Sequence, residues 1–401
     1  MIDFPHLADI VEPSPSRILM LVADGLGGLP HPETGKSELE TACIPNLDWL
    51  AQRSACGLTV PVDAGVTPGS GPGHLGLFGY DPVKYTIGRG VLEAIGIGLD
   101  VRDGDVAARG NFCTVDAQGL ITDRRAGRIS TERCVDLSKR LSAIKLAGVE
   151  TVVAPVREHR FVLMLRGVGL SPDVSETDPQ KTGVAPLDPR AESAKGNKTA
   201  KLVAEWVTQA RGLLADAAPA NMVTLRGFSH LPQLPQVGDA YRLKPAAIAA
   251  YPMYRGLARL VGMKVIPTGM TFGEEMDTLT QHWREHDFFY LHYKPADSAG
   301  EDGDFPRKVK MLEALDAAIP RLLDMKPDVF IVAGDHSTPA VLKGHSWHPV
   351  PFLLHSQWTG GLGVAGFNER ACRQGALGEF PASRVMLQAL AHAGKLVKYG
   401  A

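Results

Sequence analysis

Short, continuous apolar runs that each end near an aspartate constrain the fold of this chain more than any other feature of its sequence. The three runs and their aspartates are Ile18–Ala23 before Asp24, Phe288–Tyr293 before Asp297, and Val329–Ala333 before Asp335. Apolar runs of this length, rich in branched and aromatic residues, are typical of strands that a parallel sheet buries on both faces. A fourth apolar run, at 350–354, follows the segment GHSWH.

Segments with apolar residues at helical spacing accompany these runs. They are 246–261, 308–323 and 383–393. Pro320 is expected to kink or end the second of these helices. Strands that alternate with helices predict an α/β fold, a doubly wound, mostly parallel sheet with helices on both faces. Ligands of such sheets bind beyond the carboxyl ends of the strands, where Asp24, Asp297 and the Asp335-His336 pair fall.

The middle of the chain has a different composition. Residues 88–235 are rich in Gly, Pro and Arg, with short alternating runs at 107–115 and 161–165 and a helical pattern at 198–214. This pattern predicts a smaller α+β domain (88–235) inserted into a core domain that is formed by both ends of the chain (1–87 and 236–401).

Composition and charge narrow the class of protein. The 401-residue chain has a formal net charge of −2, which gives no electrostatic argument for nucleic acid or an anionic membrane as a partner. Its five cysteines are scattered without a CxxC spacing, so no disulfide framework or zinc knuckle is predicted, and a reducing cytoplasm is the expected location. Residues 1–17 lack the pattern of a signal peptide, and no apolar segment approaches the roughly 18 residues of a membrane span.

Polar groups with related chemistry follow the predicted strands. They are Asp24, Asp297, Glu301, Asp335, His336 and His345. Carboxylates and imidazoles without thiolates suit Mn²⁺, Mg²⁺ or Zn²⁺, and four acids in one crevice would repel each other without bound cations. Ser70, in the turn TPGSGPGHLG (67–76), would then be a metal-activated nucleophile that attacks phosphorus.

Each of these groups also has an ordinary structural interpretation. Asp24-Gly25 is suited to a turn, and Ser70 to the cap of the helix that includes His74. The segment 335–339 is suited to a helix N-terminus, and His345 and His348 to an exposed loop. Only the combination of these groups favours a metal site.

Colinear motifs over nearly the whole chain strengthen that combination. They are VADGLGG (22–28), TPGSGPGHLGLFGYDPVKYTIGRG (67–90), DRRAGRI (123–129), AAYPMYRGLARLVGM (249–263), KPADSAGEDGDFPRKVK (294–310), AGDHSTP (333–339), GHSWHPVPFLL (344–354) and the tail KYGA. In these motifs the sequence resembles the archaeal-type branch of the 2,3-bisphosphoglycerate-independent phosphoglycerate mutases, within the alkaline phosphatase superfamily. The resemblance implies an alkaline-phosphatase-like core and an enzyme that interconverts 3-phosphoglycerate and 2-phosphoglycerate in glycolysis and gluconeogenesis.

The resemblance also assigns residues to roles. It makes Ser70 the nucleophile, which carries phosphate as a transient phosphoserine. It implies two divalent metal ions, one held by Asp24, Ser70, Asp335 and His336, the other by Asp297 and His345. Glu301 stands where related sequences often have histidine, and its charge favours a harder ion such as Mn²⁺ or Mg²⁺; Co²⁺ and Zn²⁺ are the alternatives. His348 is a candidate to supply the missing nitrogen.

A mutase must also hold the phosphate and the carboxylate of a small phosphorylated substrate, and guanidinium groups suit both. The candidate substrate-binding residues are Arg109, Asn111, Arg124, Arg125, Arg128, Arg226 and Lys264. Further catalytic candidates are Arg255 and Asp123, the latter to orient or deprotonate a glycerate hydroxyl. The inserted domain is expected to close over the site, since exclusion of water protects a phosphoserine from hydrolysis. The oligomeric state is not predicted.

Two other functions fit parts of the sequence. A metal-dependent phosphatase or phosphonate-processing enzyme of the same superfamily would use the same serine and metals and release phosphate to water. A nucleotide-binding protein without catalytic activity is supported only by glycine clusters at 25–28 and 96–98, which lack the GxGxxG spacing.

Overall fold

The computed structural model describes residues 1–400, and the chain forms two compact units. Unit 1 consists of Met1–Thr86 together with the chain from Leu234 onward, and unit 2 consists of Ile87–Gln233. The limits expected from the sequence, 87/88 and 235/236, lie one and two residues from these boundaries. Each unit has its own sheet and its own hydrophobic core.

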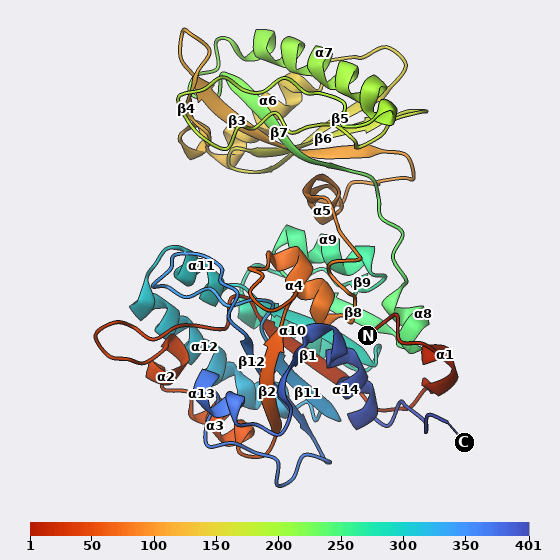
Figure 1. Cartoon of the computed structure of the whole chain (residues 1–401), viewed down its shortest axis with the longest axis vertical. Helices are drawn as coiled ribbons and strands as arrows, with labels where there is room; N and C mark the ends of the chain where they lie inside the picture. Colours follow the sequence, from red (N-terminus) through yellow and green to blue (C-terminus); the bar gives the residue numbers. More distant parts are fainter. Residues whose placement is uncertain (401) are drawn as a thin grey trace. The chain divides into compact units, whose positions relative to one another are not determined.

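An eight-stranded sheet runs through unit 1 (Figure 1). From one edge to the other, its strands are β13 (Gly378–Pro381), β2 (Ala55–Val60), β12 (Val350–Ser356), β11 (Val329–Ala333), β1 (Ile18–Ala23), β10 (Phe288–Tyr293), β8 (Pro245–Ile248) and β9 (Lys264–Val265). β12 pairs antiparallel with both of its neighbours, whereas the other neighbouring strands pair parallel. The sheet is therefore mostly parallel, as predicted. The ends of β1, β10 and β11 lie level, since Ile18 is in register with both Phe288 and Val329.

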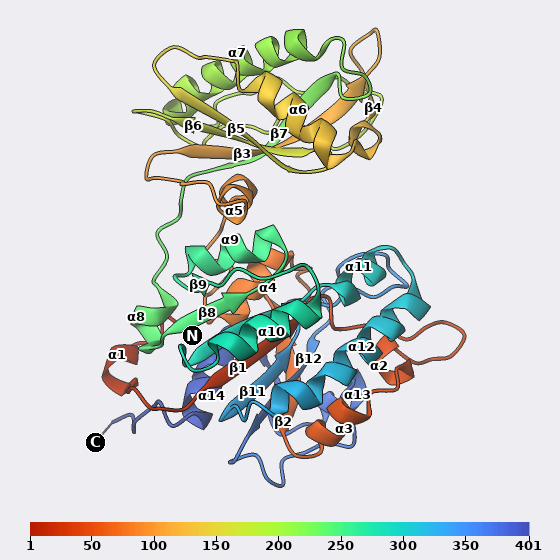
Figure 2. The ribbon, with the colours of Figure 1, turned by 180° about the vertical axis from the view of Figure 1, so that it is seen from behind.

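The helices of unit 1 are α1 (Leu7–Ile10), α2 (Glu38–Thr41), α3 (Pro45–Ala51), α4 (Ser70–Leu77), α8 (Val237–Tyr241), α9 (Pro252–Leu260), α10 (Phe272–His282), α11 (Pro295–Glu301), α12 (Phe305–Leu323), α13 (Glu369–Arg373), α14 (Val385–His392) and the 3₁₀ turn η3 (Ala382–Arg384). They cover both faces of the sheet: α4 and α14 lie in front of the strands in Figure 1, and α10 and α12 in Figure 2.

Side chains of the strands alternate between these two layers of helices. Leu19 and Leu21 of β1 share one core cluster with Leu312 of α12. Tyr290 of β10 packs instead against Phe78 at the end of α4, with ring centroids 5.0 Å apart. Both faces of the sheet are thus buried, which confirms the predicted doubly wound α/β fold.

Two helix predictions in unit 1 need correction. The segment 246–261 is not one helix, because β8 pairs with β10 and α9 begins only at Pro252. Proline suits the first turn of a helix and not its interior. α12, by contrast, continues through Pro320 to Leu323. Asn46 Nδ2 donates to the Asp316 carbonyl oxygen (3.2 Å), the acceptor that the missing N–H of Pro320 leaves without its helical partner.

Unit 2 is an α+β domain with an antiparallel sheet. Its strands are β3 (Val106–Val115), β4 (Ile121–Asp123), β5 (Glu150–Arg157), β6 (Arg160–Arg166) and β7 (Met222–Ser229). Its helices are α5 (Arg89–Gly96), α6 (Thr131–Leu141), α7 (Asn197–Leu214) and the 3₁₀ turns η1 (Ala126–Arg128) and η2 (Ala194–Gly196). Phe112 shares a core with Leu137 of α6 and Trp206 of α7. The side chain of Arg109 on β3 points to the opposite face of the sheet from that of Phe112. It contacts Glu93 of α5, so α5 covers the face of the sheet that α6 and α7 do not.

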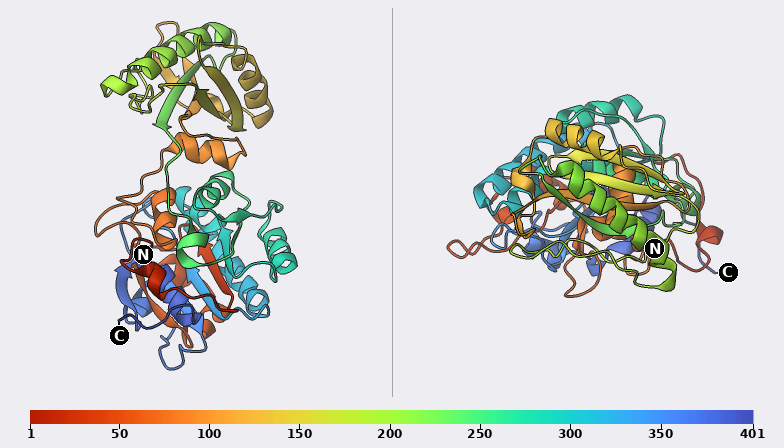
Figure 3. Two further views of the ribbon diagram at one scale, coloured as in Figure 1. Left: turned by 90° about the vertical axis from the view of Figure 1, so that its right-hand side faces the viewer. Right: turned by 90° about the horizontal axis from the view of Figure 1, so that it is seen from above.

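Residues near both ends of the chain meet in unit 1 (Figure 3). The rings of Phe4 and Tyr399 make an edge contact, with centroids 5.9 Å apart. Within residues 1–400, no helix combines the length and the apolar character that a membrane span requires.

Candidate active site

Three aspartates and two histidines meet at the carboxyl-terminal edge of the unit 1 sheet. Asp24 directly follows β1, Asp297 lies on α11 after β10, and Asp335 follows β11, next to His336. These four residues are fully buried. His345 reaches the same edge differently: it precedes β12, and because β12 is antiparallel to β11, the start of β12 lies where β11 ends.

Ser70 is the first residue of α4, directly after Gly69. Its Oγ lies 3.1 Å from His336 Nε2, so the hydroxyl faces the acid and imidazole groups rather than capping the helix. Gly73, one turn further, lies so close to Asp335 that a Cβ would overlap the Asp335 carbonyl oxygen. Because the N-terminus of a helix favours negative charge, α4 presents this hydroxyl where an anionic oxygen or a phosphate is stabilised.

Asp24, Asp335 and His336 form a first group, whose ligand atoms all lie within 4.8 Å of one another. His336 Nε2 is 3.4 Å from Asp24 Oδ1 and 3.1 Å from Asp335 Oδ2. Within the described chain, neither of these two buried carboxylate oxygens accepts a hydrogen bond. Buried carboxylates normally do, so oxygens left without donors beside an imidazole fit a divalent cation.

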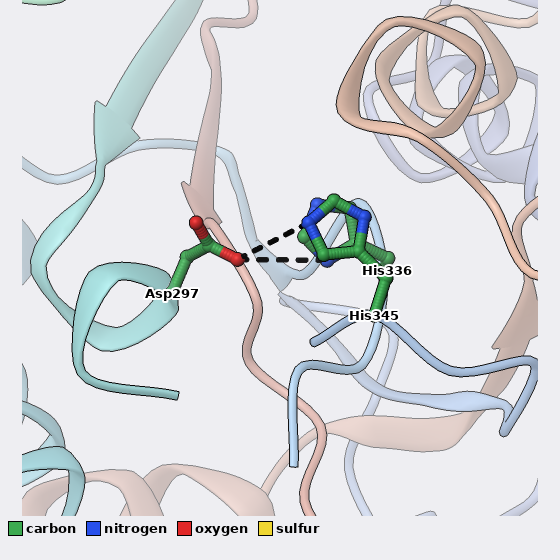
Figure 4. A group of neighbouring side chains, drawn as sticks. All are labelled: Asp297, His336 and His345. Carbon is green, nitrogen blue, oxygen red and sulfur yellow. Dashed lines mark ion pairs between the residues drawn. The ribbon is translucent and has the colours of Figure 1, made fainter. Parts of the chain in front are cut away.

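Asp297, His336 and His345 form a second group (Figure 4). Asp297 Oδ1 is 3.6 Å from His345 Nε2 and 3.9 Å from His336 Nδ1, and the two imidazole rings stack with centroids 3.6 Å apart. His345 Nδ1 is 2.9 Å from the Pro68 carbonyl oxygen, which only an N–H can satisfy, so Nε2 is left free to bind a cation. Glu301 lies at the rim, with Oε1 3.8 Å from His345 Nε2 and its side chain 56% exposed.

Sequence reasoning gave no role to several residues that contact these groups. Lys294 Nζ donates to Asp24 Oδ2 (3.1 Å) and to Asp297 Oδ2 (2.5 Å), and so lies between the two groups. Tyr254 donates its hydroxyl to Asp24 Oδ2, and His292 Nε2 lies 3.2 Å from the same oxygen. The position of Lys294 directly after a predicted strand was the available signal. No sequence signal marks Tyr254 and His292, because an aromatic residue or a histidine in an apolar helix or strand is usually just part of the hydrophobic core.

Neighbouring opposite charges at this edge of the sheet shift one another's pKa values. Burial and the neighbouring Asp335 oppose ionisation of Asp24, but the charge of Lys294, a hydrogen bond from His292 and the nearby His336 hold its pKa below the ordinary value. Burial likewise opposes ionisation of Asp335, yet His336 and His74 hold its pKa well below the ordinary value. The carboxylates in turn raise the pKa of His336 to about 9 against the effect of burial. Asp24 and Asp335 are therefore ionised although both side chains are fully buried.

Several basic residues of unit 2 lie near His159 or on the paired strands β3 and β7. Arg109 of β3 is the cross-strand partner of Arg226 of β7. The uncharged side chain of Asn111 accepts a hydrogen bond from Arg109 Nε through its Oδ1 (3.3 Å). Burial and nearby arginines lower the pKa of His159 to about 4. The arginines that do so are Arg160, Arg109, Arg125 and Arg128. We call this set, with Arg226, the arginine cluster.

Two other predicted residues of unit 2 are engaged in local hydrogen bonds. Arg124 donates to both carboxylate oxygens of Asp178, at 3.2 and 2.8 Å. Asp123 accepts the backbone N–H groups of Arg125 and Gly127, at 2.7 and 2.6 Å, and these bonds hold its pKa below the ordinary value.

The structure does not bring every predicted residue of unit 1 to the aspartate edge. Lys264 is exposed and in register with Ala246, near the beginning of the strands rather than their carboxyl ends. His348 bonds Ser346 Oγ through Nδ1 (3.0 Å) and stacks on Trp347. Arg255 follows Tyr254 on α9, and its buried Nε has no hydrogen-bond partner among the described residues.

An α/β sheet with a serine at a helix N-terminus, beside two acid and imidazole groups, defines a class of site that is suited to phosphoryl transfer. A family model described as 2,3-bisphosphoglycerate-independent phosphoglycerate mutase matches residues 51–221. A protein of Aquifex aeolicus, named a probable 2,3-bisphosphoglycerate-independent phosphoglycerate mutase, is 49% identical over 405 residues, which cover 98% of this chain and 99% of that protein.

Two solved structures have the same fold. A protein from Pyrococcus horikoshii superposes with a TM-score of 0.84 at 26% identity, covering 96% of this chain and 99% of its own. The cofactor-independent phosphoglycerate mutase of Thermoplasma acidophilum gives 0.71 at 29% identity, covering 94% of this chain and 100% of its own. The chain belongs to the 2,3-bisphosphoglycerate-independent phosphoglycerate mutase family, which confirms the resemblance seen in its motifs.

Proposed function

We propose that this protein interconverts 3-phosphoglycerate and 2-phosphoglycerate through a phosphoserine at Ser70. The observation that carries the proposal is the position of Ser70 Oγ, 3.1 Å from His336 Nε2 in the first group, in a chain of this family. In the reaction, Ser70 Oγ takes the phosphoryl group from one glycerate oxygen, and the other glycerate hydroxyl takes it back. In the first transfer the proton of the serine hydroxyl passes to the glycerate oxygen that loses the phosphoryl group, and in the second the proton of the accepting glycerate hydroxyl returns to Ser70 Oγ.

Two divalent ions fit the two groups, and we propose Mn²⁺ because most of the donor atoms are carboxylate oxygens. Asp24, Asp335, His336 and Ser70 would hold one ion, and Asp297, His345 and Glu301 the other. Bound there, the ions would lower the pKa of the serine hydroxyl and neutralise charge on the phosphoryl group. Lys294, between the two groups, would add a fixed positive charge for a phosphoryl oxygen.

We propose that the arginine cluster of unit 2 binds the anionic groups of the substrate. Its guanidinium groups suit both phosphate and carboxylate. Asn111 and Asp123 would bind a glycerate hydroxyl, and the depressed pKa of Asp123 suits a hydrogen-bond acceptor better than a base. Arg124 would position Asp178 rather than contact substrate, and Arg255 is the candidate for the phosphoryl group in unit 1. A reducing cytoplasm is the proposed location, in keeping with five free cysteines.

The experiment that tests this function measures both products that 3-phosphoglycerate can give. Purified protein is incubated with 3-phosphoglycerate and Mn²⁺; 2-phosphoglycerate is followed through coupling to enolase, and inorganic phosphate is followed in parallel. We expect 2-phosphoglycerate as the main product, with little phosphate released. Dominant release of phosphate would overturn the mutase function in favour of a phosphatase.

A further inference from the structure

Thr338 lies between the two candidate metal groups, and its hydroxyl contacts both. Thr338 Oγ1 donates to Asp297 Oδ1 (2.7 Å) and lies 2.9 Å from His336 Nδ1. Asp297 also accepts from Lys294 Nζ through its other oxygen, and the single hydroxyl proton of Thr338 points to Asp297 Oδ1. The oxygen therefore offers a lone pair to His336, and Nδ1 of His336 must carry a proton.

This arrangement decides which nitrogen of His336 is free. His336 is shared geometrically by both groups, with Nε2 facing Asp24 and Asp335 and Nδ1 facing Asp297. With Nδ1 occupied by Thr338, only Nε2 is left to bind a cation. His336 then serves the first group alone, and an imidazolate bridge between two ions is excluded.

The backbone of Thr338 has a separate, structural task. Its N–H donates to the Gly27 carbonyl oxygen (3.0 Å), and its own carbonyl accepts from Lys308 Nζ (2.9 Å). These bonds join the loop after β1 to the loop after β11. A substitution that changes only the side chain leaves them in place, so the two roles of the residue can be tested separately.

We infer that Thr338 is a positioning residue that fixes the protonated nitrogen of His336 and the orientation of Asp297, and so assigns one imidazole to each of the two cation groups. The inference rests on the proposed function, because it concerns residues that would hold the two ions. Neighbours that orient metal ligands in this way typically change metal affinity by about 10- to 100-fold when they are removed.

The test uses Thr338→Val, which keeps shape and backbone but removes the hydroxyl, and Thr338→Ser, which restores it. Thr359→Val is the matched control: this fully buried threonine also donates its hydroxyl to backbone carbonyls of unit 1, those of Arg53 and Ser356, and contacts no candidate metal residue. Binding of Zn²⁺ to the metal-free proteins is measured by calorimetry, and thermal unfolding confirms that each variant is folded.

We expect Thr338→Val to bind Zn²⁺ about 10- to 100-fold more weakly, with Thr338→Ser and Thr359→Val close to the wild type. Unchanged affinity in Thr338→Val, or equal loss in Thr338→Ser, would overturn the inference. A second measurement needs no variant: in ¹⁵N-histidine-labelled wild-type protein loaded with Zn²⁺, His336 Nδ1 should carry a proton. A spectrum without that proton would overturn the inference, whereas wild-type protein that binds neither Zn²⁺ nor Mn²⁺ would overturn the proposed function instead.

Discussion

Asp297 Oδ1 and His345 Nε2 lie 3.6 Å apart, although Asp297 follows β10 and His345 precedes β12. They meet because β12 runs antiparallel to both of its neighbours. The chain therefore enters β12 at the edge of the sheet where β11 and the strands parallel to it end. The entering segment is fixed by the bond from Ser346 N to the Ser337 carbonyl oxygen (2.9 Å). The second group is therefore closed by a loop that is tied to the first.

Replacement of the proposed nucleophile gives the most direct prediction. Ser70→Ala should lower kcat by roughly 10³-fold or more, because no other hydroxyl can form the covalent intermediate. Unfolding should be nearly unchanged, since Ser70 Oγ contacts only the site. Ser54→Ala, which removes a buried hydroxyl bonded to the Leu50 carbonyl oxygen, is the control and should retain activity. Full activity in Ser70→Ala would contradict the mechanism.

The two ligands of the second group should differ in their effect on metal content. His345→Ala should reduce tightly bound Mn²⁺ from two ions to one per chain, because it removes the imidazole that faces Asp297. Glu301→Gln should lower the affinity by less, since the carboxylate is at the exposed rim. Elemental analysis and calorimetry of the metal-free proteins would measure both. Equal loss in the two variants would show that Glu301 is a full ligand.

The acids of the site could be predicted from the sequence, whereas the aromatic residue that contacts them, Tyr254, could not. Asp24 and Asp335 were predictable because strands buried on both faces are continuous apolar runs, and their carboxyl ends share one edge. Tyr254 was not, because an aromatic residue on an apolar helix stripe indicates only packing. The strand 245–248 was mistaken for helix because its short, alanine-containing run has no period of its own; only pairing with β10 makes it a strand.

Substrate affinity should depend on arginines that are not held in ion pairs. Arg125 and Arg128 make no ion pair with any described carboxylate, and both contribute to the positive charge that lowers the pKa of His159. The double variant Arg125→Met/Arg128→Met should raise KM for 3-phosphoglycerate by about 10-fold or more with little loss of stability. Arg140→Met, which removes a half-buried arginine paired with Asp216 on unit 2, should leave KM unchanged. Similar KM values in both variants would contradict the proposed substrate role.

Lys308 should be more important for stability than for chemistry. Its ammonium is fully buried and donates to the carbonyl oxygens of Gly27 (2.8 Å) and Thr338 (2.9 Å), with Glu38 Oε1 3.8 Å away. Lys308→Met should lower the free energy of unfolding by about 3–5 kcal/mol, because Glu38 is left as an unpaired buried charge. Urea denaturation measures this loss. Lys308→Met/Glu38→Gln should recover part of it, and no recovery would show that the ion pair is not the cause.

Glu275 predicts a dependence of stability on pH. Burial raises the pKa of Glu275 to about 8, although its carboxylate accepts the Ala250 N–H (2.7 Å). Between the ordinary pKa of a glutamate and about 8, the folded protein keeps a proton that the unfolded chain has lost, so the free energy of unfolding falls as pH rises. Glu275→Gln keeps an acceptor for Ala250 but has no proton to lose.

The stability of Glu275→Gln relative to the wild type should therefore increase from about pH 5 to about pH 8, by at most about 1.4 kcal/mol per pH unit. Urea denaturation at several pH values measures the difference. Glu205→Gln, at an exposed position of α7, is the control and should show no such trend. A difference between Glu275→Gln and the wild type that stays constant over this range would mean that the carboxyl is already ionised in the folded protein, with the Ala250 N–H and its surroundings stabilising the charge.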